Sequence, residues 1–197
     1  MDTSIQASDS KISVMQRVFL ILTPALLLGL GGCASQRYTV VDPPNQQVTE
    51  FDTLEIRDFT SILNDEESIA LAGEFADTLH SAVMKDRAAN PDESIFEEVV
   101  RSTEKTERVL TLDGTIVSFE KGSQAKRYFI GFGSGKAYIT IQSVFSDKAT
   151  GEQVLKTNFD GELAGGLFGG SFDETVDAVV RAYIDYFDDY FEESGIE

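Results

Sequence analysis

Cys33 is the residue of this chain whose chemistry is most clearly marked by its neighbours. It is the single cysteine of the 197 residues, and it follows Leu30, Gly31 and Gly32. A thiolate is a strong nucleophile, and it can accept a diacylglyceryl group as a stable thioether. An aliphatic residue, two small residues and a cysteine form a lipobox, whose glycines let an extended backbone enter a membrane peptidase. We therefore predict that Cys33 carries lipid, with acyl chains such as palmitate.

The apolar stretch before this motif has the length of a secretory signal. Val18–Leu30 contains 13 residues, which fits the apolar region of a signal peptide and falls short of the roughly 20 residues that span a membrane. The first 17 residues hold two acidic and two basic side chains, so a start at Met15 gives a more ordinary signal than Met1; both starts stay open. We expect residues 1–32 to be a lipoprotein signal peptide, with an uncleaved anchoring helix as the alternative.

The strong negative charge of the chain limits its partners. The formal net charge is −18, whereas nucleic-acid binding needs Lys and Arg to neutralise phosphates and peripheral binding to anionic lipid needs basic clusters. We expect no nucleic-acid partner, and we expect the membrane to hold the protein through the lipid on Cys33. One acyl chain holds a protein marginally, at about 0.8 kcal/mol per buried CH₂, and two or three hold it firmly. Once Cys33 is lipidated no thiol remains, which excludes disulfides and a catalytic cysteine.

The glycine-rich stretch 131–137 looks like a phosphate loop and fails in detail. A Walker loop needs glycine where Ile130 stands and Ser or Thr where Ala137 stands. It must also open a helix, whereas a strand pattern follows here. We therefore expect packing and close backbone crossing rather than nucleotide binding, and we expect no cofactor.

A second glycine-rich stretch, 161–170, carries an apolar tip at Leu167 and Phe168. One interpretation is that Phe168 folds back over the start of the last helix, as in a hydrophobic staple. The other is that Leu167 and Phe168 form a flap that contacts a partner or the membrane, because exposed apolar patches usually mark contact sites. The sequence leaves both interpretations open.

No arrangement of residues indicates a reaction, so we expect no enzyme activity. His80 is the single histidine, and a structural or surface role is the simpler interpretation. No serine lies in a G-x-S-x-G elbow, and neither a Cys/His metal spacing nor a calcium loop occurs, so we expect no metal. The acidic residues in 185–193 are interpreted as a solvated helix face, with weak divalent-cation binding as the alternative.

The residues after Cys33 are predicted to form a tether. Residues 34–50 are polar and include Pro43 and Pro44, a composition that favours extended chain. We expect residues 33–50 to hold the lipidated cysteine and a polar tether, and residues 51–197 to form one globular domain. Ala34 stands where the sorting signal for the inner membrane has aspartate. It is therefore compatible with the periplasmic face of the outer membrane, in a host that has one.

The globular part alternates the patterns of strands and helices. Asn64 with Glu67 resembles a capping box at the start of a helix that Asn90-Pro91 ends, and Ser171 to Glu174 resembles another. The expected strands are 54–59, 94–101, 108–120 with a bulge at Gly114, 138–146 and 153–160, the last two joined by a hairpin at 147–151. The predicted apolar stripes are Ile69, Ala72, Ala76, Leu79 and Val83 in the first helix, and Val176, Val179, Val180, Tyr183, Ile184, Phe187 and Phe191 in the last.

These elements predict an α+β fold. We expect a mostly antiparallel sheet of about five strands with two helices on one face, in the order β-α-β-β-β-β-α.

Three glycine-containing motifs, in this order, carry a resemblance to a known family. They are residues 127–137, 147–152 and 165–170. The chain resembles the domain-of-unknown-function family 4410, a group of bacterial lipoproteins without an assigned activity, best over about residues 105–190. The resemblance implies an envelope lipoprotein and supplies no catalytic residues.

Taken together, these features predict a lipid-anchored, non-enzymatic protein of the bacterial cell envelope that binds or scaffolds another envelope protein. An accessory subunit of a transport or assembly complex, docked through the flap or a sheet edge, is the first alternative. An enzyme of unrecognised type would need carboxylates converging around Gly131–Lys136.

Overall fold

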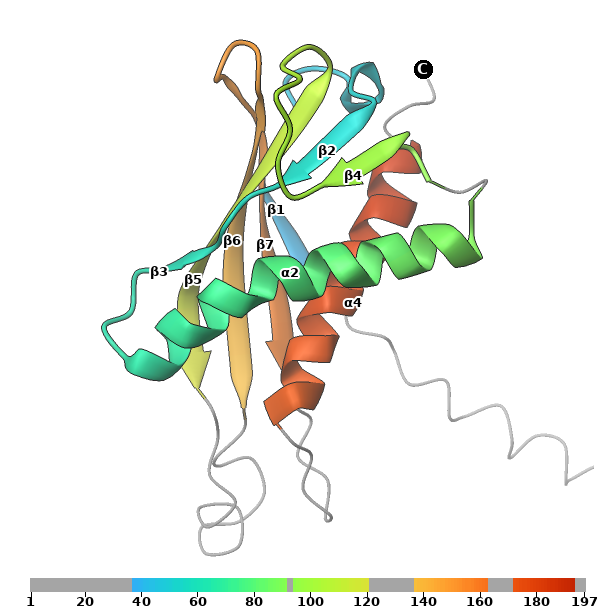
Figure 1. Ribbon diagram of the computed structural model, residues 1–197. Helices are drawn as coiled ribbons and strands as arrows, with labels where there is room; N and C mark the ends of the chain where they lie inside the picture. The colour runs from blue at the N-terminus through green and yellow to red at the C-terminus, as the bar shows by residue number, and fades with distance from the viewer. Residues whose placement is uncertain (1–36, 92–93, 121–136, 163–171, 194–197) are drawn as a thin grey trace, which may run out of the picture. The chain divides into compact units, whose positions relative to one another are not determined.

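The computed structural model describes residues 37–91, 94–120, 137–162 and 172–193 (Figure 1). Within these residues, seven strands form one sheet in the order β1-β7-β6-β5-β2-β4, with β3 alongside β5. Two long helices, α2 and α4, and one 3-10 turn, η1, complete the described part of the chain. The elements are β1 (Tyr38–Asp42), η1 (Val48–Glu50), β2 (Thr53–Ile56), β3 (Thr60–Ser61), α2 (Glu66–Ala89), β4 (Glu98–Val100), β5 (Val109–Glu120), β6 (Tyr138–Asp147), β7 (Gln153–Glu162) and α4 (Phe172–Glu193).

The sheet is mixed, which corrects the expectation of a mostly antiparallel sheet of about five strands. β2 runs parallel to both β4 and β5, and β3 runs parallel to β5. The other pairs, β1 with β7, β5 with β6 and β6 with β7, are antiparallel. Because α2 carries the chain back along the sheet, β4 re-enters it in the direction of β2. β1, β3 and β4 have two to five residues each, too few to show an apolar alternation in the sequence.

Both helices lie over the same face of the sheet, as predicted (Figure 1). α4 follows β7 and β6, whereas α2 crosses β3, β4 and β5 (Figure 1). They meet through Phe75 of α2 and Tyr183 of α4, whose ring centroids are 6.0 Å apart. One buried core lies between the two helices and the sheet.

The predicted tether is wrong for residues 38–50. β1 pairs with β7, and Tyr38 packs edge-on against Tyr186 of α4 with ring centroids 4.9 Å apart. Val48 of η1 is fully buried. The sequence did not predict these contacts because the stretch is mostly polar. Its few apolar side chains contact residues that are distant in the sequence.

Helix α2 starts one residue later than the sequence pattern predicts. Its N-cap is Asp65, whose carboxylate accepts hydrogen bonds from the backbone N–H and the hydroxyl of Ser68, each 2.7 Å long. The predicted capping box of Asn64 and Glu67 is therefore wrong. Ile69 was expected in the core but is 55% exposed. The buried side of the helix instead contains Ser68 and the residues that lie above it at helical spacing. That side contains Ser68, Ala72, Phe75, Ala76, Leu79 and Val83. The predicted end of the helix at Asn90 is confirmed.

Strand β2 is buried on both faces, whereas a half-buried strand over 54–59 was expected. All four of its residues are buried. β4 and β5 lie on opposite sides of β2, so the connection between them crosses β2 and covers it. Lys105 in that connection donates a 3.0 Å hydrogen bond to the hydroxyl of Thr53. The predicted strand 94–101 is reduced to the three residues of β4.

Strand β5 has the predicted extent, but the bulge is not at Gly114. Gly114 pairs regularly with Ser143, and the irregularity lies between Ile116 and Ser118. Gly114 is needed for another reason. A Cβ there would lie 2.2 Å from the ring of Phe59.

The hairpin between β6 and β7 is confirmed. Gly151 has a φ of 74°, which favours glycine, and its N–H donates a 2.8 Å hydrogen bond to the carbonyl of Asp147.

Of the stripe predicted for α4, Val179, Val180, Tyr183 and Phe187 are buried, whereas Val176 and Ile184 are only half-buried. Tyr186, which the prediction left out, is fully buried. The ring of Tyr183 stacks on Phe159 of β7 with centroids 3.7 Å apart, and its hydroxyl shares a 2.5 Å hydrogen bond with that of Ser143. Burial raises the pKa of Tyr183, in part offset by that hydrogen bond. Ser171 and the side chains of Phe172 and Phe191 are outside the described residues.

Candidate functional site

The site residues predicted from the sequence fall outside the described part of the structure. Cys33, Leu167, Phe168 and the stretch Gly131–Lys136 all belong to stretches that the structure does not describe. Lipid attachment at Cys33, the apolar flap and the interpretation of the glycine-rich stretch therefore stay predictions.

His80 has a structural position, which agrees with the simpler interpretation of it. It is half-buried on α2, and its Nε2 lies 3.2 Å from the carbonyl oxygen of Val99 on β4. The hydrogen bond links the helix to a sheet edge. Among the described residues no group of three or more His, Cys, Asp and Glu is placed to hold a metal ion.

The described residues form a groove between the N-terminal halves of α2 and α4. We call it the α2/α4 groove. Its volume is about 480 Å³, within the range of roughly 300–1,000 Å³ that is usual for ligand sites. Its lining consists of Glu67, Ala70, Leu71, Glu74, Phe75 and Thr78 of α2, Phe119 of β5, and Asp173, Val176 and Asp177 of α4.

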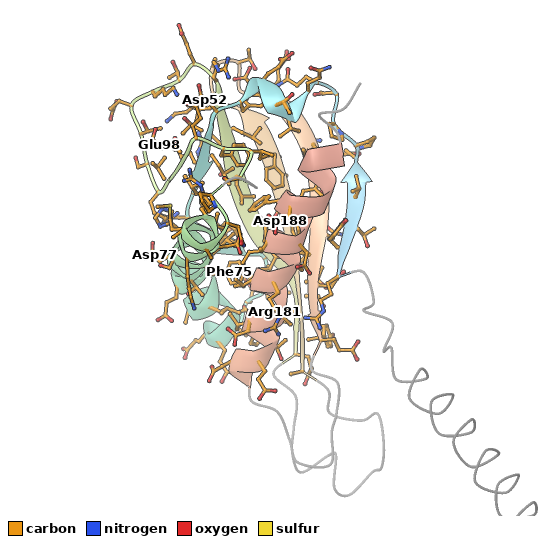
Figure 2. All side chains as sticks on the ribbon, turned by 90° about the vertical axis from the view of Figure 1, so that its right-hand side faces the viewer. Asp52, Phe75, Asp77, Glu98, Arg181 and Asp188 are labelled. Carbon is orange, nitrogen blue, oxygen red and sulfur yellow. The ribbon has the colours of Figure 1, made fainter. Side chains whose placement is uncertain are left out.

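Helical spacing explains why these side chains face one another. The α2 residues recur at intervals of three and four from Glu67 to Thr78, so they occupy one side of that helix. Asp173, Val176 and Asp177 repeat the same interval on α4. Phe75 belongs to both the groove and the core, and it lies where α2 meets α4 (Figure 2). The groove is thus a consequence of two helices whose ends diverge from a shared contact.

The groove combines an apolar floor with acidic edges. Leu71, Val176 and Phe119 are half-buried, and Phe75 is fully buried. Exposed carboxylates stand on both helices, Glu67 and Glu74 on α2 and Asp173 and Asp177 on α4. No Lys or Arg is among the described residues that line it. Such a surface can bury apolar groups and attract positive charge at the same time.

A second cluster of charged residues surrounds β2, at the crossover from β4 to β5. Lys148 contacts the carboxylate of Glu55 and the carbonyl of Thr103, and Arg57 lies 3.4 Å from Asp113. Burial raises the pKa of Asp113, against the lowering effect of Arg57. These charges are paired within the chain, so the cluster fixes the crossover and offers no vacant group to a ligand.

Asp52 and Arg101 extend this network. Hydrogen bonds from Lys105 and then Thr53 lower the pKa of Asp52, and Arg108 adds to the effect. Arg101 binds Asp58 at 2.5 Å and Asp77 of α2 at 2.7 Å. The network thereby connects the crossover to the helix layer.

The two outer strands of the described sheet are poorly suited to pairing with another chain. β1 has a register shift between Val40 and Asp42 and is followed by Pro43 and Pro44. At the other edge, β4 has only three residues. Bulges, prolines and short strands are the usual means by which proteins prevent edge pairing. The α2/α4 groove is therefore the better candidate for a contact site.

Sequence reasoning missed this site although part of its signal was present. The side chains at Glu67, Leu71, Glu74 and Thr78 have the spacing of one helix face, but the interpretation of this helix from the sequence considered only its apolar side chains. No local pattern shows that α4 would lie beside that face.

Neither helix of the described residues combines the length and the apolarity that crossing a membrane requires.

Comparisons with solved structures give weak similarities over most of the chain. The PelC dodecamer from Paraburkholderia phytofirmans has 10% identity and a TM-score of 0.47, covering 74% of this chain and 94% of that one. Protein XCC0632 from Xanthomonas campestris has 12% identity and a TM-score of 0.44, covering 80% and 94%. Lipoprotein GNA1162 from Neisseria meningitidis has 10% identity and a TM-score of 0.38, covering 68% and 98%. Similarities this weak say nothing about function.

Comparison with protein families gives a clear result. No curated protein matches the chain. The family described as a domain of unknown function, DUF4410, matches residues 39–164, a range that starts in β1 and ends just after β7. It covers more than half of the sequence and includes the first two of the three glycine-containing motifs. The chain therefore belongs to the DUF4410 family.

Proposed function

We propose that this protein is a lipid-anchored, non-enzymatic component of the bacterial cell envelope that binds or scaffolds another envelope protein. The observation that carries the binding role is the α2/α4 groove. It has a volume of about 480 Å³, and it combines an apolar floor with acidic edges. The lipobox that ends at Cys33 supports the anchor, and Ala34 after it supports the periplasmic face of the outer membrane.

The chemistry of the groove supports binding rather than catalysis. Thr78 carries the only hydroxyl among its described lining residues, and that hydroxyl donates a 3.1 Å hydrogen bond to the carbonyl of Glu74 in its own helix. The four carboxylates are exposed on two helix surfaces, where water and salt screen them. These are the properties of a contact surface.

Mass spectrometry of the protein purified from membranes tests the anchor. We expect a chain that begins at Cys33 and carries acyl chains on that residue. The Cys33→Ala variant should keep its leader and lack lipid. An unmodified thiol on a chain that still has its apolar leader would contradict the proposal.

Site-specific photo-crosslinking in intact cells tests the binding role. A photo-reactive residue in place of Thr78 should give a discrete adduct with another envelope protein, because position 78 lies in the groove. The matched control replaces Glu152, which is exposed beside the β6–β7 hairpin at the other end of the sheet (Figure 1). Equal adducts from both positions, or none from position 78, would contradict a role for the groove.

A further inference from the structure

We propose that the α2/α4 groove binds a cationic amphipathic segment of a partner protein. This inference rests on the proposed binding function and adds the chemistry of the partner. It follows from three properties of the groove: the sign of its edges, the nature of its floor and its length.

The edges of the groove attract positive charge from both sides. Glu67 and Glu74 stand on α2, and Asp173 and Asp177 stand on α4, without a basic side chain among the described lining residues. Around β2, by contrast, acidic and basic side chains are interspersed. The one-sided charge of the lining is therefore local and does not simply repeat the net charge of the chain. A segment with Lys or Arg on both of its flanks would complement these edges.

The floor of the groove calls for apolar groups between those charges. Leu71, Val176 and Phe119 retain exposed surface, which an apolar stripe on the partner would cover. A metal ion or a small cation would leave this surface in water. An anion would be repelled by the four carboxylates at the edges of the groove. Apolar side chains flanked by positive ones satisfy both features.

The dimensions of the groove suit a short helix. From Glu67 to Thr78 the lining residues of α2 cover about 17 Å at 1.5 Å per residue, which corresponds to roughly three turns of a partner helix. An amphipathic helix laid in a groove presents its anchors at spacings of three and four. The lining of α2 has that same spacing, which allows side chains of the two helices to interlock.

Direct binding of model peptides to the full chain provides the test. The lipidated protein is placed in nanodiscs of neutral phosphatidylcholine, with empty nanodiscs as background. The probes are an amphipathic Leu/Lys peptide of about 14 residues, roughly four helical turns, and a Leu/Glu peptide of the same length and pattern. Affinity is measured by fluorescence anisotropy. We expect the Leu/Lys peptide to bind in the micromolar range and the Leu/Glu peptide not to bind.

Charge reversals locate the binding site. The double variant Glu74→Lys/Asp177→Lys places one positive charge on each edge of the groove, away from the first helical turns, where a lysine would oppose the helix dipole. We expect about tenfold weaker binding of the Leu/Lys peptide. The matched control Glu104→Lys/Glu152→Lys makes the same change in net charge at exposed positions outside the groove. It should weaken binding less than about twofold. Both variants should retain the melting temperature of the wild type.

Several outcomes would overturn the proposal. They are no binding of the Leu/Lys peptide, equal binding of the Leu/Glu peptide, or equal losses in the two double variants. A carbodiimide crosslink in the free protein between a groove carboxylate and a lysine of residues 121–136 would show that the chain itself occupies the groove. A dimer that only the groove variant dissociates would identify a second copy as the occupant. An adduct from position 78 together with no peptide binding would overturn the cationic partner and leave the proposed function intact.

Discussion

Gly114 shows how a single missing side chain shapes the core beneath the helices. The ring of Phe59 occupies the space that a Cβ at position 114 would need, and Phe59 packs on Phe75 of α2 with ring centroids 5.2 Å apart. The glycine therefore lets the residues after β2 reach the helix layer. This is a close approach of side chain to backbone, not the bulge that the sequence suggested.

Gly114→Ala should destabilise the protein by roughly 1–3 kcal/mol, because the ring of Phe59 must move within a packed core. Gly73→Ala is the matched control. Gly73 lies in the exposed face of α2, where an added methyl group would meet nothing within 4 Å, so alanine there should stabilise by about 0.5–1 kcal/mol. Urea denaturation measures both. A neutral Gly114→Ala variant would show that Phe59 has room to move.

Asp52 provides a prediction about pH at the same scale. Hydrogen bonds from Lys105 and Thr53 hold its folded-state pKa below the ordinary value of 3.8. A carboxyl whose pKa is lowered by folding stabilises the folded state above its unfolded pKa, and this contribution is lost as pH falls through the folded pKa. The ion pairs of Asp52 should therefore stabilise the protein at neutral pH and cease to do so in acid.

Asp52→Asn should lower the melting temperature by the same amount at about pH 7 and about pH 5, and the difference should shrink only below pH 3.8. Differential scanning calorimetry of both proteins across this range measures the effect. A difference that already disappears near pH 5 would contradict the lowered pKa.

At the scale of elements, the crossover from β4 to β5 explains an unusual buried charge. Glu55 lies in β2, between β4 and β5, and is only 6% exposed. Lys148, at the end of the β6–β7 hairpin, contacts its carboxylate and the carbonyl of Thr103 in the crossover. One ammonium group thus links three segments that are far apart in the sequence. Losing one partner of a buried pair is costly, because the other charge stays in a poorly solvated place.

Lys148→Met should therefore destabilise the protein by roughly 2–4 kcal/mol. Lys156→Met is the control, since Lys156 is a half-buried lysine on β7. Its replacement should change stability by less than about 0.5 kcal/mol. Adding Glu55→Gln to Lys148→Met should restore part of the loss. Equal effects of the two lysine variants in urea denaturation would argue against a special role for the pair.

At the scale of the whole molecule, the main correction concerns where the folded domain begins: its first strand starts at Tyr38. β1 continues the sheet beyond β7, and Tyr38 packs on Tyr186 and Phe159. The folded part therefore begins at β1, which starts at Tyr38, and not near residue 51 as predicted.

A chain that starts at residue 37 keeps every residue of β1, whereas one that starts at residue 43 lacks the strand. The longer form should be as stable as the full chain. The shorter form should lose roughly 2–4 kcal/mol, since removing Tyr38 and Val40 uncovers core residues and one side of β7. Urea denaturation of the two forms decides the point. Equal stability would mean that β1 contributes nothing to the fold.

The features that the sequence determined by itself are those with a local physical cause. The hairpin at 147–151 follows from a glycine with positive φ, the helix end at Asn90 from the proline after it, and the long strands and the stripe of α4 from apolar spacing. The two motifs that lie within the family match are also continuous stretches of the chain. Each of these depends on neighbours along the sequence, so a linear pattern contains it.

Only the tertiary structure decided the parallel pairs of β2, the place of β1 in the sheet and the α2/α4 groove. Each joins segments that lie tens of residues apart, such as Thr53 with Val109 or Tyr38 with Phe159. Short strands show no apolar period, and the exposed acids of one helix carry no sign of the helix beside them. These contacts are selected by which surfaces bury one another, a property of the whole fold that no local stretch of residues contains.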